Sequence, residues 1–431
     1  MTILLPPTLT TRAAQSTLNT LFTDRSLLLG MKAMQDELGD IFSLSFPGFK
    51  ATVMSGPEAA HFTYVKARHN LYWRTEDDPV TGLLRHGLLV EDGDSHDHLR
   101  RDVMPSLHRQ RVIEYIPIFL KRTSQVCETW NLDQPLDMLV EMRRIALLIL
   151  MDTLFDVDMT PDLDRMWKVI IRTLKFISPG VWLVWRDIPR PGFSRELHKL
   201  DNYLYELIDE RRTKKRPGDD LLTHLINIGM DNNLIRDQLL TLLIAGHDTS
   251  TALLAWTIYS LASNPQILGQ AQAEVDSVLG GQSPDYSLIG GLIYLDQVIK
   301  ETLRLYPPIH VSNRRVMEDI EFHGYRIPAG VRLMFSIYLT HHDKKNWQDP
   351  ERFDPQRFAP GIKYPPYVFV PFGGGPRNCI GASFAQDEAK VILAWLLQHY
   401  NFTLLQSSVR LYMGATLEPR PEVLVRVSPR R

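Results

Sequence analysis

The sequence predicts a mainly α fold with a minor antiparallel sheet, of the α+β class rather than of alternating βαβ units. Two observations carry this prediction. From about residue 96 to residue 230, apolar residues recur at helical spacing, interrupted by turns that contain Pro and Gly. Segments with the alternation typical of strands gather instead near the start of the chain and in its last third. Helices and strands are therefore separated along the chain.

The first expected strands form a hairpin. Residues 41–46 and 50–55 alternate apolar and polar side chains around Pro47 and Gly48, a pair that favours a turn. The same strand signals return at residues 314–317, 320–322, 331–340, 402–405 and 423–427.

The longest helix is expected at residues 234–263, an apolar stretch that ends just before a proline. At about 1.5 Å per residue it would cross a whole domain, so we expect it to be central and buried. Shorter helices are expected at residues 295–306 and 382–399.

The composition excludes several classes of protein. The chain has 431 residues, 44% of them hydrophobic and 23% charged, which is enough apolar material for a large core. No internal repeat or linker divides it, so we expect a single domain over residues 1–431. The formal net charge of -2 argues against a nucleic-acid partner. The two cysteines, far apart, exclude a disulfide framework and fit a reducing cytoplasm.

No segment is expected to cross a membrane. Residues 1–12 lack the charged region and long apolar stretch of a signal peptide. The apolar runs at residues 145–151 and 239–245 are much shorter than the roughly 18 residues that a span requires.

One loop has the chemistry to hold a single sulfur. Residues 372–381 contain four glycines, a proline, an arginine and Cys379, directly before an expected helix. Glycines let backbone amides approach the sulfur, and a helix N-terminus favours negative charge, so both would stabilise a thiolate. A phosphate-binding loop is disfavoured because Gly-Lys-Ser/Thr is missing. A cysteine hydrolase would need a histidine partner that the sequence cannot place. Cys127, beside Trp130, is expected to be an ordinary buried residue.

Three further motifs lie upstream of this loop. Residues 245–249, Ala-Gly-His-Asp-Thr, place an acid and a hydroxyl in the long apolar helix, where helix propensity favours neither. A helix kink with a solvated acid is the alternative interpretation. Glu301 and Arg304 share one helical face, as do His96 and Arg100, and either pair taken alone would be an ordinary surface pair.

These motifs in this order resemble one family. Phe372, Gly375, Arg377, Cys379 and Gly381 match the fixed positions of the heme-binding signature of the cytochrome P-450 superfamily, which the chain resembles from about residue 40 onward. The resemblance implies a triangular-prism fold that holds heme b, with the Cys379 thiolate as the axial ligand of the iron. It also implies that Arg377 pairs with a heme propionate and that Phe372 shields the sulfur.

The resemblance assigns roles to the other motifs. His96 and Arg100 would clamp the heme propionates, and Arg314 would be a further propionate partner, with the adjacent Arg315 as an open alternative.

Two more roles concern proton supply and the stability of the loop. Thr249 would hydrogen-bond the dioxygen and Asp248 would relay protons from solvent. Glu301, Arg304 and Arg352 would form a buried triad that braces the cysteine loop, and loss of one member would leave the others unpaired.

The resemblance also outlines a substrate pocket, most of which is apolar and indicates a hydrophobic substrate. Its expected segments are residues 75–90, 167–185, 242–249, 309–313 and 413–416. The candidate contacts within them are Ala245, His310, Val311 and Met413, with Ser312 and Thr416 as further polar positions. Trp182 and Trp185 would form either an entrance lid or ordinary aromatic packing.

The implied reaction inserts one oxygen atom from O2 into a hydrophobic substrate. Electrons from NAD(P)H would arrive through a separate ferredoxin or flavodoxin with its reductase, docked on exposed bases such as Arg101, Lys344 and Lys345. We expect a cytoplasmic monomer. Two alternatives remain: a peroxide-driven or isomerising heme-thiolate enzyme, and a heme sensor or carrier without turnover.

Overall fold

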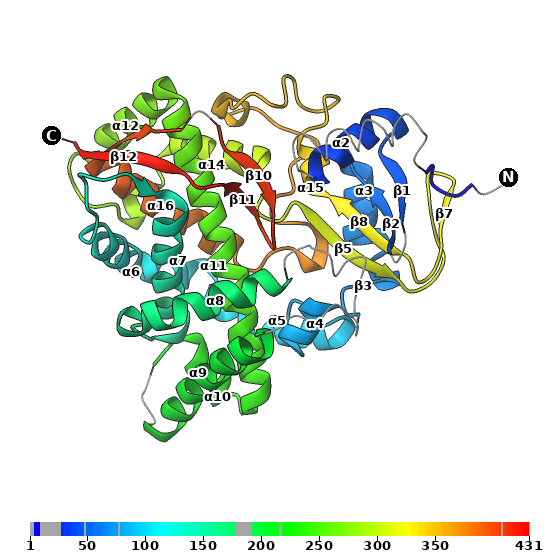
Figure 1. The fold of residues 1–431 in the computed structure, drawn as a ribbon, viewed down its shortest axis with the longest axis horizontal. Helices are drawn as coiled ribbons and strands as arrows, with labels where there is room; N and C mark the ends of the chain where they lie inside the picture. Colours follow the sequence, from blue (N-terminus) through cyan, green and yellow to red (C-terminus); the bar gives the residue numbers. More distant parts are fainter. Residues whose placement is uncertain are drawn as a thin grey trace.

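The computed structural model describes residues 4–8, 27–46, 49–75, 78–177, 192–214, 218–406 and 408–430. Its outline is roughly triangular, with helices in the larger part, one group of strands toward the side of the N-terminus and another that leads across the molecule to the C-terminus (Figure 1). The α-helices are α2 (Leu27–Leu38), α3 (Pro57–His61), α4 (Pro79–Leu84), α5 (Gly93–Val103), α6 (Arg109–Cys127), α7 (Met138–Phe155), α8 (Leu163–Ile177), α9 (Phe193–Lys214), α10 (Leu221–Asn227), α11 (Asn232–Ser263), α12 (Pro265–Leu279), α13 (Tyr286–Ile289), α14 (Ile293–Leu305), α15 (Ile337–His341) and α16 (Ala382–His399).

The strands form small sheets. They are β1 (Ile41–Phe46), β2 (Phe49–Met54), β3 (Leu71–Tyr72), β4 (Leu136–Asp137), β5 (Val311–Val316), β6 (Ile320–Phe322), β7 (Tyr325–Ile327), β8 (Arg332–Ser336), β9 (Tyr400–Leu404), β10 (Arg410–Met413), β11 (Leu417–Arg420) and β12 (Leu424–Pro429). The largest sheet has the order β1-β2-β8-β5-β3. Its pairs are antiparallel except β2 with β8, which run parallel. The mainly α fold with minor sheets is therefore confirmed, with this one parallel pair added.

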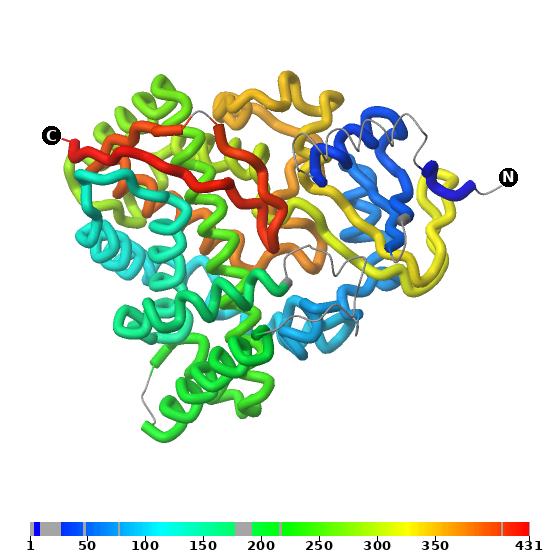
Figure 2. Tube along the Cα trace, viewed as in Figure 1, coloured from blue at the N-terminus to red at the C-terminus, as the bar shows by residue number. Residues whose placement is uncertain are grey.

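The two ends of the described chain lie on opposite sides of the molecule (Figure 2). The short segment near residue 4 bridges to β7 through Leu4 and Tyr325. At the other end, β12 pairs with both β9 and β4, so the end of the chain lies beside the segment that leads into α7.

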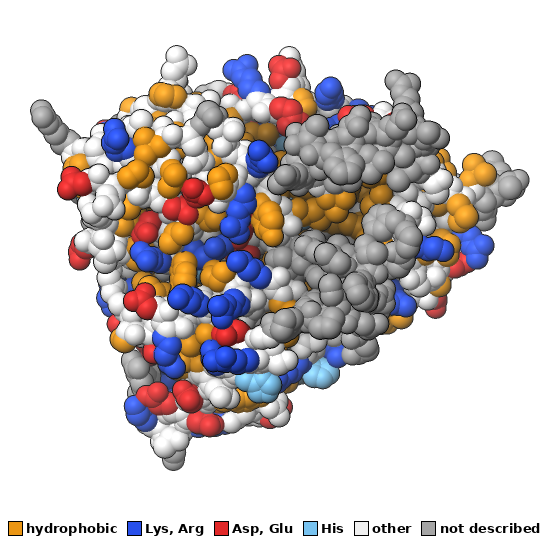
Figure 3. Space-filling view, viewed as in Figure 1, with side chains coloured by type: hydrophobic (Ala, Val, Ile, Leu, Met, Phe, Trp, Pro, Cys, Tyr) orange, Lys and Arg blue, Asp and Glu red, His pale blue; other side chains and the backbone are white. Residues whose placement is uncertain are grey.

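Charge is unevenly spread on the surface. On the face shown in Figure 3, Lys and Arg side chains gather over α7 and α8. A net charge of -2 for the whole chain thus conceals a local basic area.

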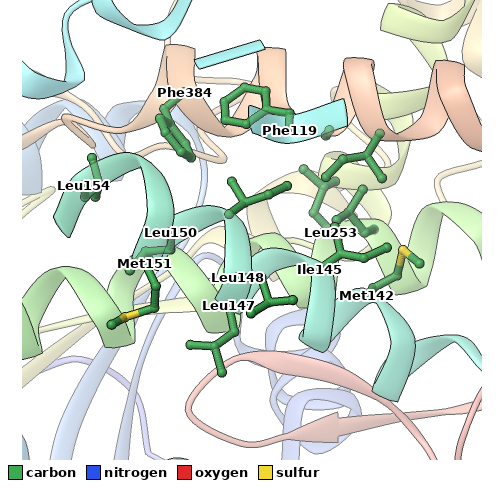
Figure 4. Packing of buried hydrophobic residues seen from close by; sticks show 14 of the residues in the cluster. Phe119, Met142, Ile145, Leu147, Leu148, Leu150, Met151, Leu154, Leu253 and Phe384 are labelled. Atoms are coloured by element: carbon green, nitrogen blue, oxygen red, sulfur yellow. The ribbon is translucent and has the colours of Figure 1, made fainter. Parts of the chain in front are cut away.

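The core of the helical part is built around α11. Figure 4 shows Phe119 of α6, Leu253 of α11 and Phe384 of α16 among the leucines of α7. Burial of each such side chain stabilises the fold by roughly 1.5–3 kcal/mol. Among the described residues, α11 alone has the length and mean hydropathy of a membrane-crossing helix, yet 83% of its apolar window is buried inside the protein. The predicted central and buried helix is confirmed.

One expectation for local structure was wrong. The strand expected at residues 331–340 ends at Ser336, whose Oγ accepts a hydrogen bond from the Leu339 amide at 3.1 Å and so caps the short helix α15. Residues 413–416, one of the expected pocket segments, contain the turn between β10 and β11, as the expected turn there requires. The turn at Pro47-Gly48 and the segment with Trp182 and Trp185 lie outside the described residues.

Candidate active site

The cysteine loop folds back on itself before α16 begins. The Cys379 amide donates to the Phe372 carbonyl at 2.9 Å, and the Asn378 amide donates to the Gly375 carbonyl at 3.1 Å. Gly375 has a φ of +63°, and a Cβ at this position would lie 2.3 Å from the Tyr64 carbonyl oxygen. Only glycine therefore fits here, which accounts for one fixed position of the motif.

The Cys379 thiol has accessible surface, although protein surrounds it on most sides. Burial raises its pKa, while the backbone amide of Gly381 and the cation of Arg100 act in the opposite direction. The expected stabilising groups are thus present, but they are outweighed by the loss of hydration. A thiolate at this sulfur needs a positive partner, and a metal ion supplies one. Burial also raises the pKa of the Cys127 thiol, as expected for a core residue.

A set of buried and half-buried basic side chains lies beside the loop. Burial, and then the charge of Arg377, lower the pKa of Arg314 to about 10. The pKa of His96 is lowered by burial and then by Arg377. Arg377 Nη2 lies 3.0 Å from Asp92 Oδ1, but it makes no hydrogen bond of good geometry among the described residues. Like charges that lower one another's pKa indicate a site for an anion.

Arg100 and Arg314 reach this area from different elements. Arg100, in α5, donates from Nη1 to the Asn378 carbonyl at 2.8 Å and from Nη2 to Asn378 Oδ1 at 2.9 Å, so it holds the residue before Cys379. Successive side chains of a strand point to opposite faces. The charge of Arg377 lowers the pKa of Arg314, which favours Arg314 for the anion site.

These residues fit heme. A soft sulfur ligand stands in a loop that glycine keeps open to close approach, and the basic side chains of α5, β5 and the loop match two propionate groups. The residues that would hold the group are Cys379 at the iron and His96, Arg100, Arg314 and Arg377 around the propionates.

The acid-and-hydroxyl motif lies where the burial of α11 is interrupted. Between Ile235 and Ala262 the described side chains are buried except at Ala245, Gly246, Thr249 and Tyr259. Thr249 Oγ1 donates to the Ala245 carbonyl at 2.6 Å. A Cβ on Gly246 would lie 2.6 Å from Leu150, so this glycine serves the packing of α7. Ala245 and Thr249 are thus accessible on a helix that is otherwise mostly buried.

Asp248 is not a solvated acid, so that alternative interpretation was wrong. Its side chain is buried, Thr416 Oγ1 donates to Oδ2 at 2.8 Å, and Arg143 Nη2 donates to Oδ1 at 3.4 Å. Burial raises the pKa of Asp248 to about 6, the charge of Arg143 opposes this rise, and Glu418 adds to it. Thr416, expected in the substrate pocket, is buried against this acid instead.

Ser250 connects the motif helix to the helix that follows the cysteine loop. Its Oγ donates to Glu388 Oε2 of α16 at 2.5 Å. Burial raises the pKa of Glu388 to about 8, so this acid is largely protonated at neutral pH. The contact ties the two motifs to adjoining helices of one core.

The predicted triad is correct in two members and wrong in the third. Glu301 and Arg304 are fully buried and joined by two hydrogen bonds of 2.7 and 2.8 Å. Arg352 does not join them: its side chain is 70% exposed and lies 4.0 Å from Asp354. Arg357 takes the place instead, with Nε 3.3 Å from Glu301 Oε1. Pro-x-Arg-Phe occurs twice, at residues 350–353 and 355–358, and the second copy folds toward Glu301.

The pocket candidates are partly brought together. Val311 of β5 and Met413 of β10 belong to one hydrophobic cluster. His310 is buried and its pKa is lowered to about 4 by burial, so it is neutral at pH 7. Its Nδ1 has no hydrogen-bond partner among the described residues. Ile309, next to it, is 40% exposed despite its apolar side chain.

The expected docking bases are surface residues with their own contacts. Lys345 Nζ lies 2.7 Å from Asp40 Oδ2, and Arg101 Nη2 lies 3.1 Å from His98 Nδ1. Lys344 is exposed.

Comparison with known proteins supports a single interpretation of this site. The family described as "Cytochrome P450" matches residues 15–424. "Putative cytochrome P450 139" of Mycobacterium tuberculosis is 32% identical over 409 residues, which cover 90% of this chain and 95% of that protein. "Cyclooctatin synthase" of Streptomyces melanosporofaciens is 28% identical over 91% of this chain and 88% of that protein. "Cyclooctat-9-en-7-ol 5-monooxygenase" from the same organism is 29% identical over 75% of this chain and 74% of that protein.

Proposed function

The chain belongs to the cytochrome P-450 family and is an oxidoreductase of the monooxygenase type, and we propose that it hydroxylates or epoxidises a hydrophobic substrate with O2. We further propose that residues 1–431 form one heme b domain and that the protein is a cytoplasmic monomer. Electrons from NAD(P)H would come through a separate ferredoxin or flavodoxin and its reductase.

The observation that carries the proposal is the pairing of two sites in one core. One is a cysteine loop flanked by basic side chains, and the other is the accessible Ala245 and Thr249 pair beside the buried acid Asp248. A heme carrier has no use for an acid and a hydroxyl on a buried helix. A peroxide-driven enzyme needs no proton supply, so the same pair disfavours that alternative.

Each group has a distinct task in the proposed reaction. Heme, when bound, supplies the iron chemistry that activates O2. Cys379 holds it by its sulfur, Gly375 and Gly381 shape the loop, and Phe372 covers the sulfur. The basic side chains of His96, Arg100, Arg314 and Arg377 would bind its propionates. Glu301, Arg304 and Arg357 hold the loop in place.

The residues of the α11 motif would transfer protons, and those of the expected pocket would contact the substrate. Asp248, with a pKa of about 6, can give up and regain a proton near neutral pH, and Thr249 would pass it to oxygen. Apolar Val311 and Met413, with neutral His310, would contact the substrate and leave orientation to few polar groups.

The identity of the sulfur ligand is tested by spectroscopy. Reduced protein with carbon monoxide should have the red-shifted Soret band of thiolate ligation. Cys379→Ala should lose this band, while Cys127→Ala, a matched change at the other cysteine, should keep it. Loss of the band in both variants or in neither would overturn the assignment.

Measurements of turnover distinguish the proposed monooxygenase from a peroxide-driven enzyme. Thr249→Ala should consume NAD(P)H with much less product formed per electron pair. Thr257→Ala is the control, because Thr257 makes the same kind of hydrogen bond within α11, to the Leu253 carbonyl at 2.7 Å, but in a fully buried turn. Unchanged coupling in Thr249→Ala, with product made only from peroxide, would favour the peroxide-driven enzyme.

A further inference from the structure

Asp248 of α11 belongs to a larger buried network of charged side chains and is its most buried member. Arg143 of α7 pairs with both Asp248 and Glu418, and Glu418 lies in β11 of the hairpin. Thr416, two residues before Glu418, donates to Asp248 at 2.8 Å. Three elements from distant parts of the chain therefore converge on one carboxyl group.

The network extends to the surface. Arg420 Nη2 lies 2.7 Å from Glu418 Oε2, and the Arg420 side chain is 39% exposed. Glu418 itself is 9% exposed and Asp248 is 4% exposed. Exposure thus falls step by step along β11 from solvent to the centre of α11. On the face shown in Figure 3, Lys and Arg side chains gather over the neighbouring α7.

Several nitrogens around this path are buried without a hydrogen bond among the described residues. They are Arg143 Nε, Arg420 Nε and both ring nitrogens of His247. The ring of His247 faces the backbone of Arg143, but neither nitrogen has good hydrogen-bond geometry. Unpaired polar atoms in a core are costly, and a group of them around one arginine is the setting that ordered water satisfies.

We propose that Glu418 and Arg143, with ordered water between them, form the route by which protons from solvent reach Asp248. The inference rests on the proposed monooxygenase function and adds the route that supplies it. Arginine keeps its proton at all relevant pH values, so Arg143 holds the carboxylates and water in place without carrying the proton. The proton comes from bulk water at Arg420, binds a Glu418 oxygen, and leaves it as an Asp248 oxygen is protonated.

The charges that face Asp248 suit this exchange. Arg143 from α7 favours its ionised form, Glu418 from β11 favours its protonated form, and Thr416 donates to it. His247 of the same helix stays neutral, because burial lowers its pKa to about 3. With these opposing effects, the pKa of Asp248 of about 6 leaves both forms populated near neutral pH.

The hairpin does not depend on Glu418 for its position. Trp256 Nε1 of α11 donates to the Leu417 carbonyl at 2.8 Å, and Leu417 is fully buried in the cluster that contains Val311 and packs against Met413. Replacing Glu418 should therefore leave the strand in place. The same hairpin carries a proposed substrate contact and the proton route.

The test compares Glu418→Gln with Glu422→Gln, a partly exposed glutamate just beyond the same strand. Wild type and both variants should have the thiolate-type carbon monoxide spectrum. Glu418→Gln should form product roughly tenfold more slowly, with a larger solvent deuterium isotope effect, because proton supply becomes limiting. Glu422→Gln should match the wild type.

A second measurement does not depend on turnover. Infrared titration of the ferric protein should show a carboxyl band that titrates near pH 6 and is absent in Asp248→Asn. In Glu418→Gln this band should titrate at lower pH, because a negative neighbour is gone and Arg143 is left to Asp248 alone.

The outcomes separate the two proposals. Wild type without the thiolate-type spectrum would refute the monooxygenase function. A normal spectrum, with Glu418→Gln equal to wild type in rate, isotope effect and infrared titration, would refute the route alone. If Glu418→Gln does not fold, Arg420→Gln at the exposed end replaces it and should raise the isotope effect in the same direction; no change there would also refute the route.

Discussion

Two buried ion clusters of this protein differ in how completely their hydrogen-bonding groups are satisfied. The brace cluster is Glu301, Arg304 and Arg357, and the relay cluster is Asp248, Arg143 and Glu418. In the brace cluster all five N–H groups of Arg304 donate, two to Glu301 and three to backbone carbonyls of residues 341, 350 and 352.

In the relay cluster, by contrast, the N–H groups of the arginine are not all hydrogen-bonded among the described residues. Arg143 divides one nitrogen between two carboxylates and leaves Nε without a partner among the described residues. Its acid Asp248 has a strongly raised pKa. A fully satisfied network fixes geometry, whereas a partly satisfied one can change its protonation at little cost. The first suits a support for the cysteine loop, and the second suits a proton donor.

The largest effect is expected when the brace cluster is broken at its centre. Arg304→Met leaves Glu301 buried without its main partner and removes five hydrogen bonds, so we expect a loss of about 3–5 kcal/mol in the free energy of unfolding. Heme content should fall with it, because the loop loses its support. Denaturant unfolding and heme content of the purified protein measure both effects. A loss below 1 kcal/mol would contradict the role of the brace.

Replacing Asp248 in the relay cluster should mainly change how the free energy of unfolding depends on pH, rather than its value at one pH. Folding raises the Asp248 pKa from 3.8 to about 6, so the folded state holds this proton more tightly than the unfolded state does. This contribution to stability is complete below about pH 4 and is lost as pH rises through 6. Asp248→Asn cannot titrate, so from pH 4 to pH 7 its stability should rise relative to wild type by up to about 3 kcal/mol. Parallel curves of unfolding free energy against pH would contradict the raised pKa.

Arg357 contributes less than Arg304 because it makes fewer bonds. Its Nε lies 3.3 Å from Glu301 Oε1, and its Nη2 donates to the Asp349 carbonyl at 2.8 Å. Arg357→Gln should cost about 2 kcal/mol, the range of hydrogen bonds to charged groups. Thermal unfolding with heme bound and removed separates this effect from heme binding, and equal stability of variant and wild type would remove Arg357 from the brace.

The cysteine loop and the helices could be predicted from the sequence because their signals are local. The Cys379 loop gathers its chemistry in ten consecutive residues, and α16 begins and ends where its pattern does. The relay cluster could not be predicted in this way. Asp248 is 105 residues from Arg143 and 168 from Thr416, and nothing near either partner indicates the pairing.

The sequence predicted Arg352 instead of Arg357 for the triad, and this prediction was wrong for a different reason. Both stand in the same Pro-x-Arg-Phe pattern, five residues apart, so local sequence cannot distinguish them. The distinction arises from the short 3-10 helix at Pro355–Phe358, which Asp354 caps by accepting from the Gln356 amide at 3.1 Å while its own amide donates to Glu301 at 2.9 Å. That turn directs Arg357 inward and leaves Arg352 outside.

The smallest effect is therefore expected at Arg352, and it decides between the two arginines. Its side chain is 70% exposed and its nearest carboxylate is 4.0 Å away, while the brace uses only its backbone carbonyl. Arg352→Ala keeps that carbonyl, so the free energy of unfolding should change by less than about 0.5 kcal/mol, as for exposed ion pairs. Measured beside Arg357→Gln under one set of conditions, the two variants should differ by more than 1 kcal/mol. The reverse order would restore Arg352 to the triad and place Arg357 outside it.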